Sequence, residues 1–260
     1  MIWRRHRRSS PSLSRSDIRT SWQVTSLLLD YPDERLIELL PTLRDALADA
    51  PSAVADPLRA VLEHLESRPL QQVQSAYIDT FDVTRRCALH LTYYTCGDTR
   101  KRGVELIRFK QAYRSAGVEM DDRELPDHLC VLLEFGAAHD LDTAWKLLCD
   151  NRVGIELLQR ALNAKSSPWL PAVESLRATL PVLDGTDEEA LARLIAEGPP
   201  SEQVGLDLPG YAIDPRLNPN PWGAPPPMLP PGAPNSLRSP IPIYPVDKAP
   251  SSPSTVGAPR

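Results

Sequence analysis

Apolar residues recur at helical spacing through most of the chain between residues 16 and 197. In the first such segment, one helical face carries Ile18, Trp22, Thr25 and Leu29. Sustained alternation of apolar and polar residues is missing, and no Asn-Gly or Asp-Gly turn separates alternating runs. The pattern therefore predicts an all-α protein.

Capping residues and prolines divide this pattern into separate helices. Ser16 is expected to cap a first helix that runs to about Leu29, and Asp33 to cap a second helix that Pro41 breaks or kinks. Further helices are expected at about 53–67, 69–81, 98–116, 126–135, 142–163, 168–180 and 187–197. Gly117 is expected to end its helix in the left-handed conformation, and Pro126 with Asp127 to open the next one.

The composition changes near residue 199, and 18 of the chain's 28 prolines lie from this residue onward. Proline fixes φ and removes a backbone donor, so helices and central strands are not expected there. We therefore expect a disordered basic arm over 1–15, one compact helical domain over 16–198, and a disordered proline-rich tail over 199–260. The tail sequence Ile-Pro-Ile-Tyr-Pro-Val at 241–246 has two interpretations, a short docking motif or plain disordered tail.

Charge and targeting signals narrow the class of partner. A formal net charge of -5 gives no general attraction for nucleic acid or anionic lipid. No stretch approaches the ~20 apolar residues of a membrane span, and the basic start lacks the apolar stretch of a signal peptide. We expect a cytoplasmic protein without direct membrane insertion, in which the four cysteines are reduced and mostly buried.

Motifs that would indicate catalysis are absent from the sequence. It contains no P-loop, dinucleotide-binding fingerprint or GxSxG elbow. Closely spaced Cys/His pairs are also missing: His128 and Cys130 would point to different helix faces, and His90 is expected to be a structural histidine. We therefore predict no catalytic residue, no metal ligand and no cofactor.

The segment 77–128 instead combines aromatic, acidic and basic residues around two helix junctions. One interpretation is a network that caps helix ends and joins neighbouring helices. The other is the polar and aromatic rim of a groove for an amphipathic peptide. The candidate peptide-binding residues are Asp79, Asp82, Arg86, Tyr93, Tyr94, Asp98, Arg100, Arg102, Glu124, Asp127 and His128.

Several motifs in this segment resemble one protein family. They are Tyr-Ile-Asp-Thr-Phe-Asp at 77–82, Arg-Arg at 85–86, Leu-Thr-Tyr-Tyr at 91–94, Gly-Asp-Thr-Arg at 97–100 and Glu-Leu-Pro-Asp-His-Leu at 124–129. Leu-Leu-Leu-Asp-Tyr-Pro-Asp at 27–33 and Val-Gly-Leu at 204–206 add to them. Over roughly residues 17–206 the chain resembles the NarJ family of respiratory nitrate reductase delta subunits.

The resemblance implies the helical fold of the TorD-like redox-enzyme maturation chaperones. It also implies binding to the N-terminal segment of the nitrate reductase catalytic (alpha) subunit, and support for molybdenum cofactor insertion before the enzyme docks at its membrane anchor. Proteins that deliver the cofactor are a further expected class of partner. Two alternatives stay open: a permanent structural subunit of a respiratory redox complex, and a helical enzyme or cofactor carrier.

Overall fold

A computed structural model of the chain describes residues 13–120, 124–183, 185–197 and 244–245. The first helices are α1 (Arg15–Leu28), α2 (Glu34–Ala46), α3 (Ser52–Glu66) and α4 (Leu70–Tyr77). They are followed by the π-helix η1 (Ile78–Asp82), the 3-10 helix η2 (Arg85–Cys87), α5 (Leu91–Cys96), α6 (Arg100–Ser115) and the strand β1 (Val118–Glu119). The last elements are α7 (Leu129–Ala138), α8 (Leu141–Asp150), α9 (Arg152–Ala164), α10 (Leu170–Ala178), α11 (Gly185–Glu197) and the strand β2 (Tyr244–Pro245).

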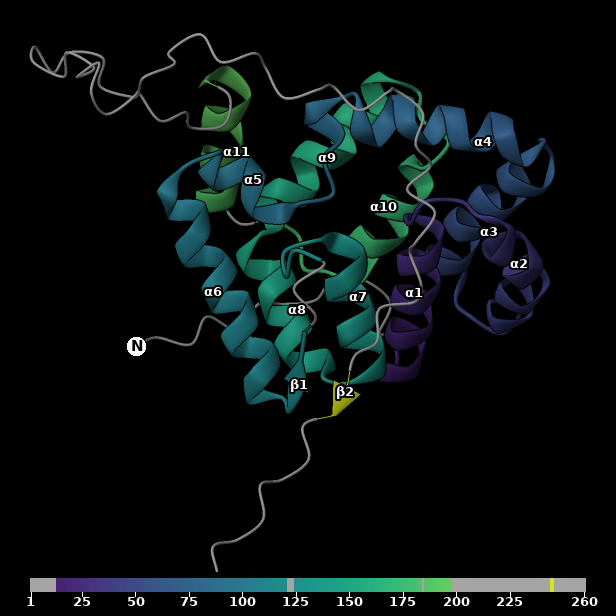
Figure 1. Ribbon diagram of the computed structural model, residues 1–260, viewed down its shortest axis with the longest axis horizontal. Coiled ribbons are helices and arrows are strands. Elements are labelled where there is room, and N and C mark those ends of the chain that lie inside the picture. The colour runs from purple at the N-terminus through teal and green to yellow at the C-terminus, as the bar shows by residue number, and fades with distance from the viewer. Residues whose placement is uncertain (1–12, 121–123, 184, 198–243, 246–260) are drawn as a thin grey trace, which may run out of the picture.

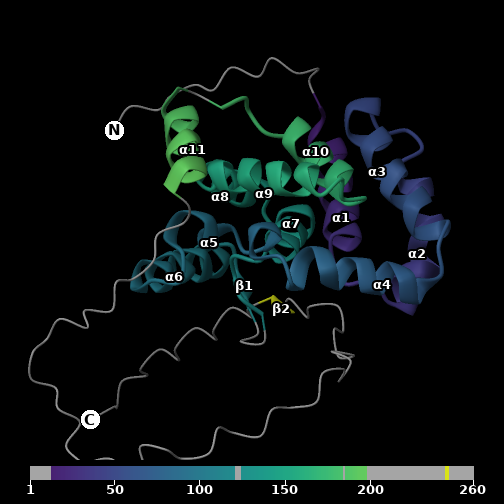
Figure 2. The ribbon, with the colours of Figure 1, turned by 90° about the horizontal axis from the view of Figure 1, so that it is seen from above.

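The helices form layers around a central pair (Figure 2). Helices α8, α9 and α10 lie along one side, and α4, α5 and α6 lie along the other. Helix α1 packs lengthwise against α7 between them, while α2 and α3 cover one end (Figures 1 and 2). The prediction of an all-α protein is confirmed.

One hydrophobic core joins residues from both ends of this bundle. Its largest fully buried side chains include Trp22, Phe109, Tyr113, Phe135 and Trp169. Hydrogen bonds between buried side chains help to join the helices across the core, because a buried donor needs a partner. Trp22 Nε1 donates to Thr179 Oγ1 at 2.9 Å, which ties α1 to the end of α10.

Several predicted helix ends are confirmed. Asp33 caps α2, with its carboxylate accepting a hydrogen bond from the Leu36 N–H at 2.8 Å. Gly117 follows the end of α6 with φ of 77°, which is the left-handed conformation expected of a residue just past a helix. The first helix begins earlier than expected, because Ser14 rather than Ser16 forms a capping box with Asp17.

Three predicted boundaries are wrong. Pro41 does not break α2, which continues through it to Ala46. The expected helix at 142–163 is two helices, α8 and α9, which are separated at Asn151. Helix α7 begins at Leu129 instead of Pro126, because Asp127 and His128 lie in a turn and a bridge that contact α5.

The predicted basic arm and proline-rich tail fall almost entirely outside the described residues. The exception in the tail is β2, which pairs with β1 in a two-stranded antiparallel sheet. Within the described part of the chain, no helix is long and apolar enough to cross a membrane.

Candidate functional site

The helix α4 continues directly into η1, where the backbone widens to a π-turn. The Val83 N–H donates to the Ile78 carbonyl oxygen at 3.0 Å, across five residues instead of four. Such turns inside helices occur frequently at functional sites. We call residues 78–83 the acidic turn.

The acidic turn exposes two carboxylates beside two aliphatic side chains. Asp79 and Asp82 are exposed, while Ile78 and Val83 keep 40% and 70% of their surface in contact with solvent. Side chains one turn apart in a helix are neighbours, so Ile78 lies next to Asp82. The turn therefore offers an amphipathic, negatively charged surface.

A lysine from α9's C-terminal end fixes the backbone of this turn. Lys165 Nζ donates to the Asp79 carbonyl oxygen at 3.0 Å and to Thr84 Oγ1 at 2.7 Å. The Thr84 hydroxyl in turn donates to the same Asp79 carbonyl at 3.0 Å. These bonds fix the backbone of the acidic turn and leave the Asp79 carboxylate exposed.

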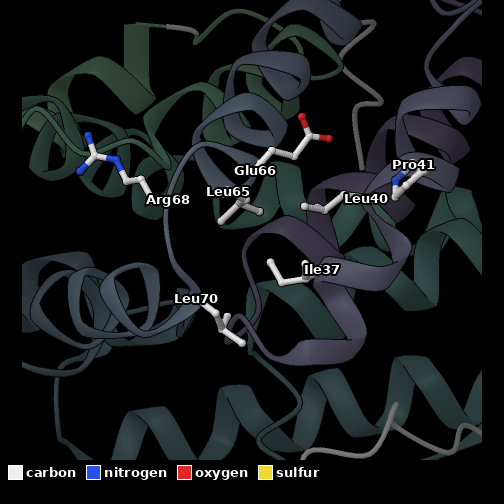
Figure 3. Close-up of a pocket in the computed structure, with 7 residues that line it drawn as sticks. All are labelled: Ile37, Leu40, Pro41, Leu65, Glu66, Arg68 and Leu70. Atoms are coloured by element: carbon white, nitrogen blue, oxygen red, sulfur yellow. The ribbon is translucent and has the colours of Figure 1, made fainter.

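A pocket of about 250 Å³ lies at the other end of α4, between α2 and the end of α3 (Figure 3). It is lined by Ile37, Leu40, Pro41, Leu65, Glu66, Arg68 and Leu70. The aliphatic side chains surround the space, whereas the guanidinium of Arg68 points away from it (Figure 3). Glu66 is held at the rim by Arg44, with Nη2 and Oε2 2.6 Å apart.

A second group of residues surrounds the fully buried carboxylate of Asp127. Its Oδ2 accepts hydrogen bonds from the Thr92 N–H at 3.2 Å and the Thr92 hydroxyl at 2.5 Å. His90 Nδ1 lies 3.3 Å from Oδ1, and Arg102 Nη2 lies 3.8 Å from Oδ2. We call His90, Thr92, Arg102 and Asp127 the Asp127 clamp.

Backbone bonds join the same two segments. The Leu91 N–H donates to the Asp127 carbonyl at 3.1 Å, and the Leu129 N–H donates to the Leu89 carbonyl at 2.8 Å. His90 and His128 form an isolated antiparallel bridge between these bonds, with their rings 5.1 Å apart edge to face. The clamp therefore joins the start of α5 to the start of α7.

The electrostatics of the clamp favour an ionised Asp127. Burial alone would raise the pKa of this carboxyl, but hydrogen bonds from His90 and Thr92 and the nearby charge of Arg102 outweigh it. The pKa of Asp127 is therefore lowered. A buried carboxylate with this many donors is typical of a structural network.

Tyr94 connects the clamp helix α5 to η2. Its hydroxyl donates to the carbonyl oxygens of both Arg86 and Ala88, each at 2.9 Å, and the residue is 5% exposed. Burial raises the pKa of this phenol well above its usual range. Tyr94 thus packs inside the protein, and Arg86 contributes through its backbone carbonyl.

The eleven predicted site residues differ in their exposure. The exposed ones are Asp79, Asp82, Arg86, Asp98 and Arg100. The half-buried ones are Tyr93, Arg102 and Glu124, and the buried ones are Tyr94, Asp127 and His128. Arg102 links two of these classes, because its Nη1 lies 3.6 Å from exposed Asp98 and its Nη2 faces Asp127.

Sequence reasoning missed the pocket and the aliphatic members of the acidic turn. Ile78 and Val83 are aliphatic, and their residue types give no sign that both side chains are exposed at this π-turn. Among the described residues, no group of three or more His, Cys, Asp or Glu side chains is placed to hold a metal ion.

The chain matches the model of a known family over residues 44–174, which is just over half of its length. The family is described as nitrate reductase delta subunit. The matched residues include the pocket's α3 and α4 side, the acidic turn and the Asp127 clamp.

Individual relatives agree with this match. The chain is 39% identical to the nitrate reductase-like protein NarX of Mycobacterium tuberculosis over 61% of its own length and 24% of that protein. It is 29% identical to the probable nitrate reductase molybdenum cofactor assembly chaperone NarJ of Bacillus subtilis, over 65% of the chain and 92% of that protein. It is 30% identical to the nitrate reductase molybdenum cofactor assembly chaperone NarJ of Escherichia coli, over 56% of the chain and 63% of that protein. The chain thus spans about a quarter of the NarX protein and most of the Bacillus chaperone.

Proposed function

Because this chain belongs to the nitrate reductase delta subunit family, we propose that it is an assembly chaperone rather than an enzyme. It binds the N-terminal segment of the nitrate reductase catalytic subunit. It supports insertion of the molybdenum cofactor in the cytoplasm, before that enzyme docks at its membrane anchor. The names of the Bacillus and Escherichia relatives support the chaperone role.

The acidic turn is the observation that carries the peptide-binding part of this proposal. Exposed Asp79 and Asp82 next to exposed Ile78 and Val83 complement a peptide that carries basic and apolar side chains on one face. A monomeric surface gains nothing by exposing Val83 at 70%, whereas a peptide that covers it gains apolar burial.

The pocket lies at the start of the same continuous helix. Leu70 lines the pocket, and Ile78 lies eight residues later on the continuous helix, which corresponds to about 12 Å at 1.5 Å per residue. A helical peptide of two to three turns spans that distance. One of its apolar side chains would enter the pocket while its basic side chains meet Asp79 and Asp82.

The Asp127 clamp has a supporting role in this proposal. It fixes the relative positions of α5, α6 and α7, so exposed Asp98 and Arg100 at the start of α6 are presented from a rigid base. A site of exposed charges and partly exposed aliphatic side chains binds with moderate affinity, which a chaperone needs in order to release its client.

Calorimetric titration of the full chain with the N-terminal peptide of the partner's catalytic subunit tests this proposal. The double variant Asp79→Asn/Asp82→Asn is expected to weaken binding by roughly 1–2 kcal/mol, since two partly screened charge pairs are lost. Its thermal midpoint should stay close to that of the unmodified chain because both side chains are exposed.

The matched control is Glu188→Gln/Glu189→Gln, which removes two exposed charges from α11. That helix lies on the opposite side of the molecule from α4 (Figures 1 and 2). An equal loss of affinity in both double variants would show that the acidic turn contributes only through the overall charge of the protein. Recovery of the chain with active, membrane-bound enzyme, instead of the immature catalytic subunit, would favour a permanent structural subunit.

A further inference from the structure

The strand β1 presents a backbone edge immediately after the longest helix of the described chain. Gly117, with φ of 77°, turns the chain out of α6, and Val118 and Glu119 then run in extended conformation. Val118 is 2% exposed and packs into the core, while Glu119 is exposed. The buried side chain of Val118 therefore fixes this edge to the core, directly after the rigid helix α6.

This edge is occupied by a distant part of the same chain. Tyr244–Pro245 pairs with it antiparallel, so that Val118 lies opposite Pro245 and Glu119 opposite Tyr244 (Figure 1). Between α11 and β2 the sequence runs through 46 residues, 198–243. The strand β2 also lies beyond residue 174, where the match to the family ends.

We infer that the Val118–Glu119 edge is a docking surface for an extended segment, and that its occupant is the chain's own Tyr244–Pro245, which acts as an intramolecular strap. Addition of a strand to an exposed edge is a general mode of peptide recognition, in which main-chain hydrogen bonds supply the affinity. Of the sequence motif at 241–246, the described residues Tyr244 and Pro245 thus support the docking interpretation rather than plain tail.

The strap is held weakly enough for another extended segment to displace it from β1. Only two residue pairs hold it. Adjacent residues of a strand direct their N–H groups to opposite sides and Pro245 has no N–H, so the Glu119–Tyr244 pair is the one that can exchange two hydrogen bonds. Because both strands belong to one chain, their pairing is intramolecular, and two residue pairs are too few to make it permanent. A free extended segment can therefore compete for the edge.

The edge also adjoins the Asp127 clamp in sequence and through α6. The Tyr113 hydroxyl, in the last turn of α6, donates to the Pro126 carbonyl at 2.7 Å. The platform that carries β1 is thus fixed to the residue preceding Asp127. The inference does not depend on the proposed chaperone role, because it concerns only an edge and its occupant.

Amide hydrogen exchange of Glu119 in the full chain tests the strap. Tyr244→Pro removes the one N–H of β2 and is expected to speed exchange at the Glu119 amide by about two- to tenfold. Tyr211→Pro, which places the same substitution elsewhere in the tail, is expected to leave the exchange of Glu119 unchanged. Identical exchange in the unmodified chain and in Tyr244→Pro would overturn the inference.

Two further arms identify the occupant. A synthetic peptide with the sequence Ile-Pro-Ile-Tyr-Pro-Val, at about millimolar concentration, should restore slow exchange to the Tyr244→Pro chain. Failure of the peptide to do so would show that the edge is not a docking surface. Protection that increases over a roughly tenfold rise in protein concentration would assign the strand to a second copy and overturn an intramolecular strap.

Discussion

Asp127 caps a helix to which it does not belong, because its carboxylate accepts hydrogen bonds from the backbone N–H and the hydroxyl of Thr92. Thr92 is the second residue of α5, whose first N–H groups have no partner within the helix. Asp127 itself precedes α7 by two residues. One side chain thus completes the end of one helix and positions the beginning of another.

Asp127→Asn is expected to lower the free energy of unfolding by about 2–3 kcal/mol, as loss of buried hydrogen bonds to a charged group does. Urea denaturation at neutral pH measures this change. Asp98→Asn is the control, because Asp98 is exposed and its distance to Arg102 is 3.6 Å, so its effect should stay within about 0.5 kcal/mol. Similar costs for the two variants would show that Asp127 has no special structural role.

Two carboxylates should affect the pH dependence of stability in opposite directions. The pKa of Asp127 is lowered by folding, so its stabilisation is complete above about pH 4 and is lost as the pH falls through the folded pKa. Burial raises the pKa of Glu134, and the charges of Asp30 and Glu124 raise it further. The ionised form of Glu134 therefore opposes folding at neutral pH.

Glu134→Gln is accordingly expected to raise the free energy of unfolding at pH 7 by a few tenths of a kcal/mol to about 1 kcal/mol. The gain in Glu134→Gln should shrink as the pH falls from the raised folded pKa of Glu134 towards its unfolded pKa of about 4.3, whereas the cost of Asp127→Asn should shrink only below about pH 4, as the pH falls through the lowered folded pKa of Asp127. Denaturant titrations of the two variants across pH check this. A loss of stability in Glu134→Gln at pH 7 would contradict it.

The fold could be predicted from sequence wherever local chemistry decides the structure. Asp33 and Gly117 act on their own helix ends, so their residue types sufficed. Asp127 has the same side-chain chemistry as Asp33 but serves α5, which lies more than thirty residues earlier in the chain. A local pattern contains no information about that partner, which is why the predicted start of α7 was wrong.

The residue types of the candidate site could be predicted from the sequence, but its division into a buried clamp and an exposed turn could not. The mixture of charged and aromatic residues at 77–128 indicated both a network and a surface, and the structure contains the buried Asp127 clamp beside the exposed acidic turn. Whether a given aromatic or carboxylate is buried depends on tertiary packing. Tyr94 and Tyr93 are adjacent, yet the first is buried and the second is half-buried.

Gly136 allows α7 to approach α1 at the ring of Trp22. A Cβ added at this position would lie 2.6 Å from both Trp22 Cζ3 and the Cβ of Ala144. Gly136→Ala is therefore expected to destabilise the protein by about 1–3 kcal/mol, since the ring and α8 must move. Gly103→Ala on α6 is the control: nothing lies within 4 Å of its added Cβ, so it should stabilise the helix by roughly 0.5–1 kcal/mol. Thermal or urea unfolding of both variants checks the opposite signs, and equal signs would refute the argument.

The last prediction concerns a buried cation in α9. Arg152 is 6% exposed, its Nη2 lies 2.7 Å from Glu156 Oε1, and Arg177 Nε lies 2.8 Å from the same oxygen. Burial lowers the pKa of Arg152 despite the Glu156 charge, and its Nε and Nη1 make no hydrogen bond.

Glu156→Gln would leave this guanidinium buried without its counter-charge, and is expected to cost about 3–5 kcal/mol in urea unfolding. Arg177→Gln should cost about 1 kcal/mol or less, because that side chain is 34% exposed and Arg152 continues to neutralise Glu156. Replacing both buried partners, as Arg152→Met with Glu156→Leu, should recover most of the stability lost in Glu156→Gln, since no unpaired charge then remains. If the double variant is as unstable as Glu156→Gln, packing around the pair rather than its charge balance holds α9 in place.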